Sequence, residues 1–152
     1  ALLGSHETDM TLFFRLLAKV DLHTVAERPE SATETVRYFN EAFYDLNRVD
    51  AAHGQALSAW LLEYRSRVDG ENLSEASRRE RMDAVNPLYV LRNYLAQLAI
   101  DKAEGGDFSG VTELLEILRR PYQVQPGCEQ YAAKRPDWAK SKPGCSMLSC
   151  SS

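Results

Sequence analysis

Hydrophobic residues recur at helical spacing along most of the chain, and they are densest between residues 86 and 100. Four leucines in this stretch are three or four positions apart, which places them on one stripe of an α-helix. They are Leu88, Leu91, Leu95 and Leu98. Further apolar residues lie off this stripe, so the helix is apolar on most sides, as is typical of a central position. Asn86 suits the N-cap and Pro87 the first helical position, so we predict a central helix over roughly residues 86–104.

Amphipathic stretches elsewhere predict the other helices of the fold. They cover approximately residues 8–20, 29–46, 50–69, 74–85 and 109–120. Ser74 is the natural N-cap of the fourth of these stretches, and Gly105-Gly106 ends the central helix. No stretch shows a convincing strand pattern, so we predict an all-α fold of about six helices around the central one.

The pattern changes at Pro121, because residues 121–152 hold four prolines, three cysteines and no helical period. Such a segment is either an extended arm lying over the domain or partly disordered. Tyr122, Tyr131 and Trp138 favour an arm that docks through aromatic side chains. We therefore predict a helical domain over 1–120 and an irregular C-terminal arm over 121–152.

Two polar residues, Arg92 and Asn93, lie among the apolar residues of the predicted central helix. Burying such groups without partners costs several kcal/mol, about 2–7 for an amide or hydroxyl. We interpret Arg92, Asn93 and the cap Asn86 as structural polar braces that hold neighbouring backbone or a carboxylate. The alternative is that Arg92 and Asn93 contact a ligand.

The 152 residues suffice for one ordinary domain, and 44% apolar with 26% charged residues is typical of a globular protein. A net charge of −4 gives no support for nucleic-acid binding. No apolar run approaches the roughly 20 residues of a membrane span, and there is no secretory signal. We expect a cytoplasmic protein, and the start in mid-element without Met indicates a fragment of a longer chain.

Candidate chemistry is sparse. His6, His23 and His53 are far apart, no HExxH or CxxC motif occurs, and we expect no metal site. The basic run of Arg78, Arg79 and Arg81 is interleaved with acidic residues. We interpret it as a solvated, self-paired face, with an anion site as the alternative.

All three cysteines, Cys128, Cys145 and Cys150, fall near the C-terminus. A thiol two residues from a chain end is exposed unless it docks, so Cys150 is a candidate reactive or oxidisable group. Cys145 could close a short disulfide with it, and the alternative is that Cys150 is a tail thiol without a role.

Several motifs together resemble one known family. NPLYVLRNYLAQLAIDKAEGGDFSGVTELLEILRRPY (86–122), the proline-rich stretch after it and the terminal SCSS are similar to the C-terminal part of the selenoprotein O family. WLLEYRSRV (60–68) is also similar to that family. The resemblance covers most of 57–152 and is weaker before that.

The resemblance implies a pseudokinase-like protein that transfers AMP from ATP to protein hydroxyls, and a chain forming the C-terminal helical part of its kinase-like fold. The family's catalytic residues lie upstream, and this chain has no glycine-rich loop, DFG triplet or lysine-bearing strand. We therefore expect no catalysis and no cofactor in this chain, with ATP and Mg²⁺ (or Mn²⁺) binding to the full-length parent.

The expected partners are the remainder of the parent kinase-like domain and, for the intact enzyme, its protein substrates. The resemblance also implies a redox role at Cys150, whereas Cys128 and Cys145 match no family position. The rival interpretation is a self-contained α-helical module whose aromatic tail binds a partner protein.

Overall fold

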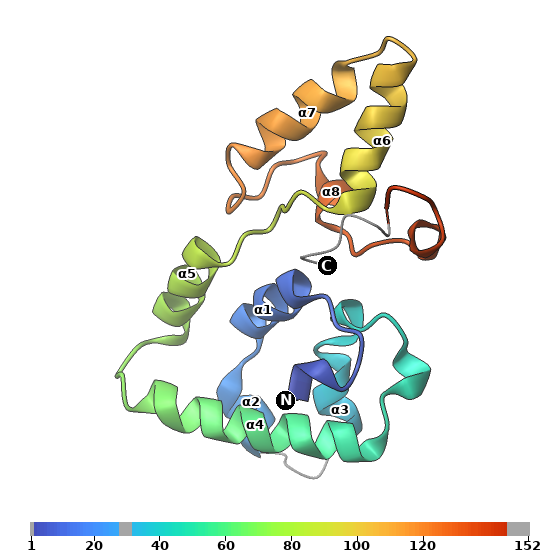
Figure 1. The fold of residues 1–152 in the computed structure, drawn as a ribbon. Coiled ribbons are helices and arrows are strands. Elements are labelled where there is room, and N and C mark those ends of the chain that lie inside the picture. Colours follow the sequence, from blue (N-terminus) through green and yellow to red (C-terminus); the bar gives the residue numbers. More distant parts are fainter. Residues whose placement is uncertain (1, 28–31, 146–152) are drawn as a thin grey trace. The chain divides into compact units, whose positions relative to one another are not determined.

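The computed structural model describes residues 2–27 and 32–145, and its regular secondary structure is helical (Figure 1). Within that part of the chain the only β-type pairing is an isolated antiparallel bridge between Thr8 and Phe43. The all-α prediction is therefore confirmed. No helix of the described residues is both long and apolar enough to cross a membrane. Contacts divide the chain into two compact units, Ala1–Asn86 and Pro87–Ser152.

The first unit is built on a long helix, α4, against which α2 and α3 pack, while α1 packs against α5. Its helices are α1 (Met10–Lys19), α2 (Leu22–Glu27), α3 (Ala32–Arg37), α4 (Ala51–Asp69) and α5 (Glu75–Val85). Three 3₁₀ turns complete it, η1 (Leu2–Gly4), η2 (Asn40–Ala42) and η3 (Leu46–Arg48). Side-chain oxygens of Asp9, Asp50 and Ser74 accept backbone N–H groups at the starts of α1, α4 and α5.

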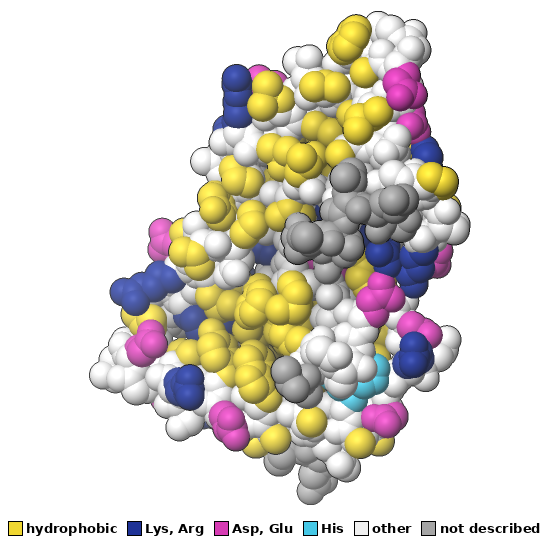
Figure 2. All heavy atoms as spheres, in the orientation of Figure 1, with side chains coloured by type: hydrophobic (Ala, Val, Ile, Leu, Met, Phe, Trp, Pro, Cys, Tyr) yellow, Lys and Arg dark blue, Asp and Glu magenta, His cyan; other side chains and the backbone are white. Residues whose placement is uncertain are grey.

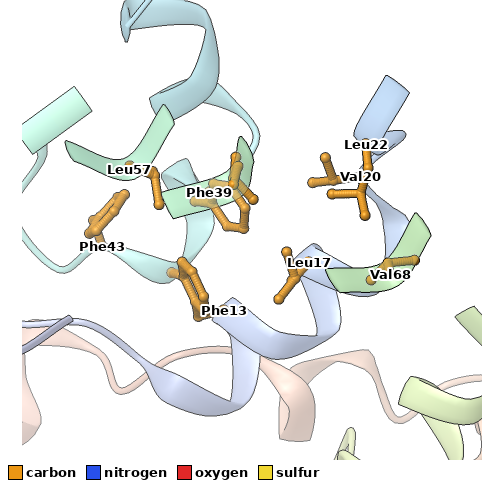
Figure 3. Packing of buried hydrophobic residues seen from close by; sticks show 10 residues of the cluster. Phe13, Leu17, Val20, Leu22, Phe39, Phe43, Leu57 and Val68 are labelled. Atoms are coloured by element: carbon orange, nitrogen blue, oxygen red, sulfur yellow. The ribbon is translucent and has the colours of Figure 1, made fainter. Parts of the chain in front are cut away.

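The core of the first unit joins side chains from α1, α2, α4 and the segment around η2 (Figure 3). The rings of Phe13 and Phe39 stack at its centre with centroids 4.6 Å apart. The buried members of the cluster are Phe13, Leu17, Val20, Leu22, Phe39, Ala42, Phe43, Leu57, Leu61 and Val68. Burial of this surface holds the short helices around α4.

The second unit is a hairpin of two helices, α6 (Asn93–Glu104) and α7 (Ser109–Leu118), onto which the following segment folds. Gly105 caps α6, and Gly106 has a φ of +87°, a conformation that L side chains rarely adopt. The later segment contributes α8 (Glu129–Ala132) and the turn η4 (Asp137–Lys140). The core of this unit consists of Tyr94, Leu95, Ala99, Leu114, Ala139 and Cys145.

The predicted central helix of 86–104 is wrong in its start and its surroundings. α6 begins at Asn93, and Asn86 is instead the C-cap of α5. Pro87 disfavours the helical conformation of the residue before it, so it ends α5 rather than opening a new helix. Residues 87–92 are non-helical, and the amides of Leu88 and Tyr89 donate to the carbonyl of Pro121. Leu98 and Ile100 on α6 are exposed, so the helix is not surrounded by apolar contacts on most sides.

The other helix predictions differ in outcome. The stretches 50–69 and 74–85 form α4 and α5, including the Ser74 cap, and 8–20 contains α1. The single helix predicted over 29–46 is wrong, because only α3, η2 and the start of η3 form there. The amides of Asp9 and Tyr44 pair with the carbonyls of Ala42 and Glu7, and this pairing replaces helical hydrogen bonds.

Candidate functional site

The predicted polar braces do not converge on one site. Asn86 belongs to the first unit, where its side-chain amide donates to the Met82 carbonyl at 2.8 Å. Arg92 and Asn93 belong to the second unit and form the N-terminus of α6. The Arg92 carbonyl accepts the amides of Leu95 and Ala96, as expected at the start of a helix. Their roles as braces stay predictions.

Arg78 lies in the first unit with only 3% of its surface exposed. Its guanidinium donates to the carbonyls of Val20 at 2.7 Å and Leu17 at 3.2 Å, and to the Glu75 carboxylate at 2.7 Å. These carbonyls lie at the C-terminal end of α1, where the helix leaves acceptors unsatisfied. The prediction of a solvated face is therefore wrong for Arg78.

Arg15 on α1 makes the converse contact with the end of α5. It is buried, and its Nη1 donates to the carbonyls of Asp83 at 3.1 Å and Asn86 at 3.2 Å. The same nitrogen is 3.0 Å from the Asp83 carboxylate. Each of the two helices thus places an arginine at the negative C-terminal end of the other, which is favourable for both helix dipoles. We call Arg15 and Arg78 the reciprocal arginine pair.

A pocket of about 290 Å³ lies beside Arg78, between the end of α1 and the start of α5. It is lined by Ala18, Lys19, Val20, Asp21, Glu75, Ala76 and Arg79. Its charges are mixed, with Lys19 and Arg79 facing the same space as Asp21 and Glu75. This composition selects neither an anion nor a cation, so the pocket assigns no ligand.

Two histidines that are 47 positions apart meet in the first unit, which the sequence spacing did not indicate. The ring centroids of His6 and His53 are 4.2 Å apart. His23 lies elsewhere, with its Nδ1 3.1 Å from Arg65 Nη2. Among the described residues, no group of three or more His, Cys, Asp or Glu could hold a metal ion.

The segment after Pro121 packs on the second unit as far as it is described. The ring of Trp138 contacts Tyr94 edge to face at 6.1 Å, Ala139 is fully buried, and Lys142 forms an ion pair with Asp101. Of the three predicted aromatic anchors, Tyr131 is partly buried and packs against the core, whereas Tyr122 and Trp138 are 44% and 46% exposed.

The thiols differ in their access to solvent. Cys145 is 4% exposed and belongs to the second core, whereas Cys128 is half-buried, and both are unbridged. Cys150 lies outside the described residues, and so does the disulfide between Cys145 and Cys150 that the sequence left open. The redox roles of Cys150 and Cys145 stay predictions.

A shallow groove of about 140 Å³ follows the contact of α6 and α7 with α8. Its lining comprises Leu95, Leu98, Ala99, Lys102, Gly110, Glu113, Leu114 and Tyr131. Burial, with a hydrogen bond to Glu113, raises the pKa of Tyr131 to about 12. Tyr131 therefore stays neutral and presents no reactive phenolate to this groove at ordinary pH.

An apolar stripe covers the outer face of α7. Phe108, Val111 and Leu115 are spaced at helical intervals and exposed, and Figure 2 shows hydrophobic side chains gathered over the α6–α7 hairpin. The buried residues of α7 are Gly110, Leu114 and Ile117, and Leu114 belongs to the core that α6 also lines. We call Phe108, Val111 and Leu115 the outer stripe. An exposed apolar patch of this kind is typical of an interaction surface.

No family model matches the chain. Curated relatives do match it along nearly its whole length. It is 54% identical over 99% of its length to the protein nucleotidyltransferase YdiU of Rhodopirellula baltica, and covers 29% of that protein.

Two further relatives carry the same name. That of Xanthomonas campestris is 53% identical over the full chain, and that of Tolumonas auensis is 50% identical over 99% of it. The chain spans 27% of the length of each. Identity at this level along the whole chain agrees with the motifs at residues 60–68 and 86–122. The chain therefore belongs to the selenoprotein O family, that of the proteins named protein nucleotidyltransferase YdiU.

Proposed function

We propose that this chain is the non-catalytic C-terminal helical region of a protein adenylyltransferase. The observation that carries the proposal is the identity of about half the residues, over the whole chain, to relatives named protein nucleotidyltransferase. The chain spans little more than a quarter of those relatives. Most of each relative therefore lies outside the matched region and is available to hold the nucleotide.

The activity proposed for the parent is transfer of AMP from ATP to a serine, threonine or tyrosine hydroxyl of a protein substrate. The hydroxyl oxygen loses its proton and bonds to the α-phosphorus of ATP. The bond between this phosphorus and the oxygen that links it to the β-phosphorus breaks, and pyrophosphate leaves. ATP with Mg²⁺ or Mn²⁺ would bind to residues outside this chain, where metal and basic groups neutralise charge that develops during transfer. A cytoplasmic location belongs to the same proposal.

The role proposed for this chain is structural. The outer stripe of α7 supports it, because Phe108, Val111 and Leu115 expose apolar surface that the remainder of the parent would cover. Asn86, Arg92 and Asn93 would brace the backbone between the helices. A second role, redox regulation through Cys150, rests on the resemblance of the terminal SCSS to the family.

The structural role is tested in the full-length protein by replacing Leu115 with Asp. We expect weaker AMP transfer and a lower melting temperature, whereas Glu116→Gln on the neighbouring exposed position leaves both unchanged. The isolated chain is expected neither to bind Mg-ATP nor to transfer labelled AMP. Unchanged transfer and melting in the Leu115 variant would contradict the scaffold role.

The rival, a self-contained interaction module, is separated by the reading frame upstream of Ala1. A glycine-rich loop, a lysine strand and a DFG-like triplet in that frame support the adenylyltransferase, whereas a start codon near Ala1 rules it out.

For the redox role, Cys150→Ser is expected to alter the activity of the intact protein only under oxidising conditions. Cys128→Ser is the control, and a Cys150 variant that matches the wild type in oxidant and reductant would overturn this role.

A further inference from the structure

Ser5, His6 and His53 form a small polar cluster where the N-terminal segment meets the start of α4. Ser5 Oγ is 3.1 Å from His6 Nδ1 and 3.4 Å from His53 Nδ1. His6 Nε2 is 2.8 Å from the carbonyl oxygen of Arg48, in η3. The turn η1 before these residues packs against α4. The cluster therefore joins three separate segments of the first unit.

These contacts define one consistent set of protons for neutral histidines. A carbonyl only accepts, so His6 carries its proton on Nε2 and donates it to Arg48. His6 Nδ1 then accepts from the Ser5 hydroxyl, and Ser5 Oγ accepts from His53 Nδ1–H. A second proton on His6 would sit on Nδ1 and reverse the direction of this contact, so that Ser5 Oγ accepts from both rings.

Burial opposes a second proton on His53. The residue is 5% exposed, its ring packs edge to face against Phe43 at 5.5 Å, and its Nε2 is buried with no hydrogen-bond partner among the described residues. The charged groups that act on it are His6 on the N-terminal segment and Asp50 on its own helix. Asp50 favours a charge on His53, but its Oδ1 is already the acceptor for the His53 backbone amide.

We propose that His6 and His53 form an acid-sensitive clasp, which holds residues 2–6 on α4 while both rings are neutral and releases them on acidification. Two imidazolium rings at this separation repel each other, and this repulsion opens the clasp. Release is local, because Glu7 and Asp9 are held separately by backbone hydrogen bonds to Tyr44 and Ala42.

The direction of the pH dependence follows from the environment of His53. Burial, and then the charge of His6, lower the pKa of His53 below its ordinary 6.5, and Asp50 opposes them only in part. A base with a lowered pKa in the folded state stabilises that state above its unfolded pKa. The clasp is therefore fully closed above pH 6.5 and weakens as the pH falls through that value toward the folded pKa.

Hydrogen–deuterium exchange of the full-length protein tests the clasp, with rates corrected for intrinsic exchange. Between about pH 7.5 and pH 5 we expect protection of the peptide covering 2–6 to fall about tenfold, because the closed clasp opposes protonation of His53 and the open one does not. Protection of the peptide covering α1 is expected to stay constant. His53→Phe, which keeps a ring but cannot titrate, is expected to remove the pH response, and the matched control His23→Phe to leave it intact.

A second variant keeps the test decisive if His53→Phe fails to fold. His6→Gln removes the like charge while keeping a hydrogen-bonding side chain, and it should reduce the pH response of residues 2–6. Equal protection of residues 2–6 at both pH values in the wild type would overturn the proposal. So would a wild-type response in the His6 and His53 variants.

Discussion

Arg78 is buried because nearly every N–H of its guanidinium meets an acceptor. Burial alone would lower its pKa, but the hydrogen bonds and charge of Glu75 outweigh this and raise the pKa overall. Three carbonyls at the end of α1, from Leu17, Ala18 and Val20, also accept from it. A buried ion is tolerated when hydrogen bonds of good geometry satisfy both the ion and the groups that it contacts. Arg78 therefore acts as a C-terminal cap for a helix other than its own.

Replacing Arg78 with Met tests this cap. The substitution nearly keeps the volume but removes the Arg78 donors from the carbonyls at the end of α1 and from the Glu75 carboxylate, so we expect a loss of about 3 kcal/mol in the free energy of unfolding. Arg81→Met, on the exposed side of the same helix, is expected to change it by less than about 0.5 kcal/mol. Urea denaturation with unchanged m-values measures both, and equal losses would show that Arg78 is no cap.

Gly144 and Gly106 have the same φ of +87° but different surroundings. A Cβ on Gly144 would collide with the Gln97 side chain, coming 2.7 Å from its Cδ, whereas a Cβ on Gly106 meets nothing within 4 Å. Gly106→Ala therefore measures backbone strain alone, of about 1 kcal/mol. Gly144→Ala in addition displaces the end of the Gln97 side chain, and this displacement next to Cys145 is expected to loosen the segment that buries the thiol.

The two glycine variants are compared by the rate at which Cys145 reacts with an alkylating reagent. Peptide mass spectrometry measures this rate. We expect a faster reaction in Gly144→Ala, and the wild-type rate in Gly106→Ala. The half-buried Cys128 serves as the internal reference. Identical Cys145 rates in the two variants would mean that the contact with Gln97 does not hold this segment.

Helix α7 carries two apolar faces in different environments. Leu114 is 8% exposed and packs toward α6, while its neighbour Leu115 is 51% exposed on the outer stripe. Leu114→Ala removes core contacts and is expected to cost about 2–3 kcal/mol. Leu115→Ala is expected to cost less than about 0.5 kcal/mol in the isolated chain.

The variants Leu114→Ala and Leu115→Ala are compared by thermal unfolding, both in the isolated chain and in the full-length protein. A larger effect of Leu115→Ala in the full-length protein would show that the outer stripe is covered there. If Leu115→Ala destabilises the isolated chain as much as Leu114→Ala does, the two-faced description of α7 is wrong.

Elements with strong local signals could be predicted, and elements set by distant contacts could not. A cap and a periodic stripe identify α4 and α5, because helix formation there needs only local residues. The start of α6 was misplaced because Asn86-Pro87 suits the end of one helix as well as the start of another. The stretch 29–46 failed because its backbone pairs with the N-terminal segment.

The candidate site shows the same limit at the level of side chains. Nothing in the spacing of Arg78 among acidic neighbours indicates that it crosses to the end of α1, because the carbonyls it reaches are some 60 positions away. The meeting of His6 and His53 likewise depends on tertiary packing. The motif over 86–122, in contrast, identified the family although the helix assigned to it was displaced.

The described residues form two cores rather than one. Phe13, Phe39 and Leu57 belong to the first, and Leu95 and Leu114 to the second. Contacts divide at Asn86 and Pro87, within the segment that was predicted to open a single central helix. A chain of this length could form a single core, so the division shows that each part buries its own apolar surface.

Independent cores predict independent responses to cavity-forming substitutions. Leu57→Ala should lower hydrogen-exchange protection in α1 and α4 and leave α6 and α7 unchanged, because Leu57 is fully buried in the first core. Leu95→Ala should do the reverse. Each substitution is expected to cost about 2–5 kcal/mol within its own unit. Hydrogen exchange measured in the full-length protein tests this independence. Equal loss of protection in both units from either substitution would mean that the two units unfold as one cooperative body.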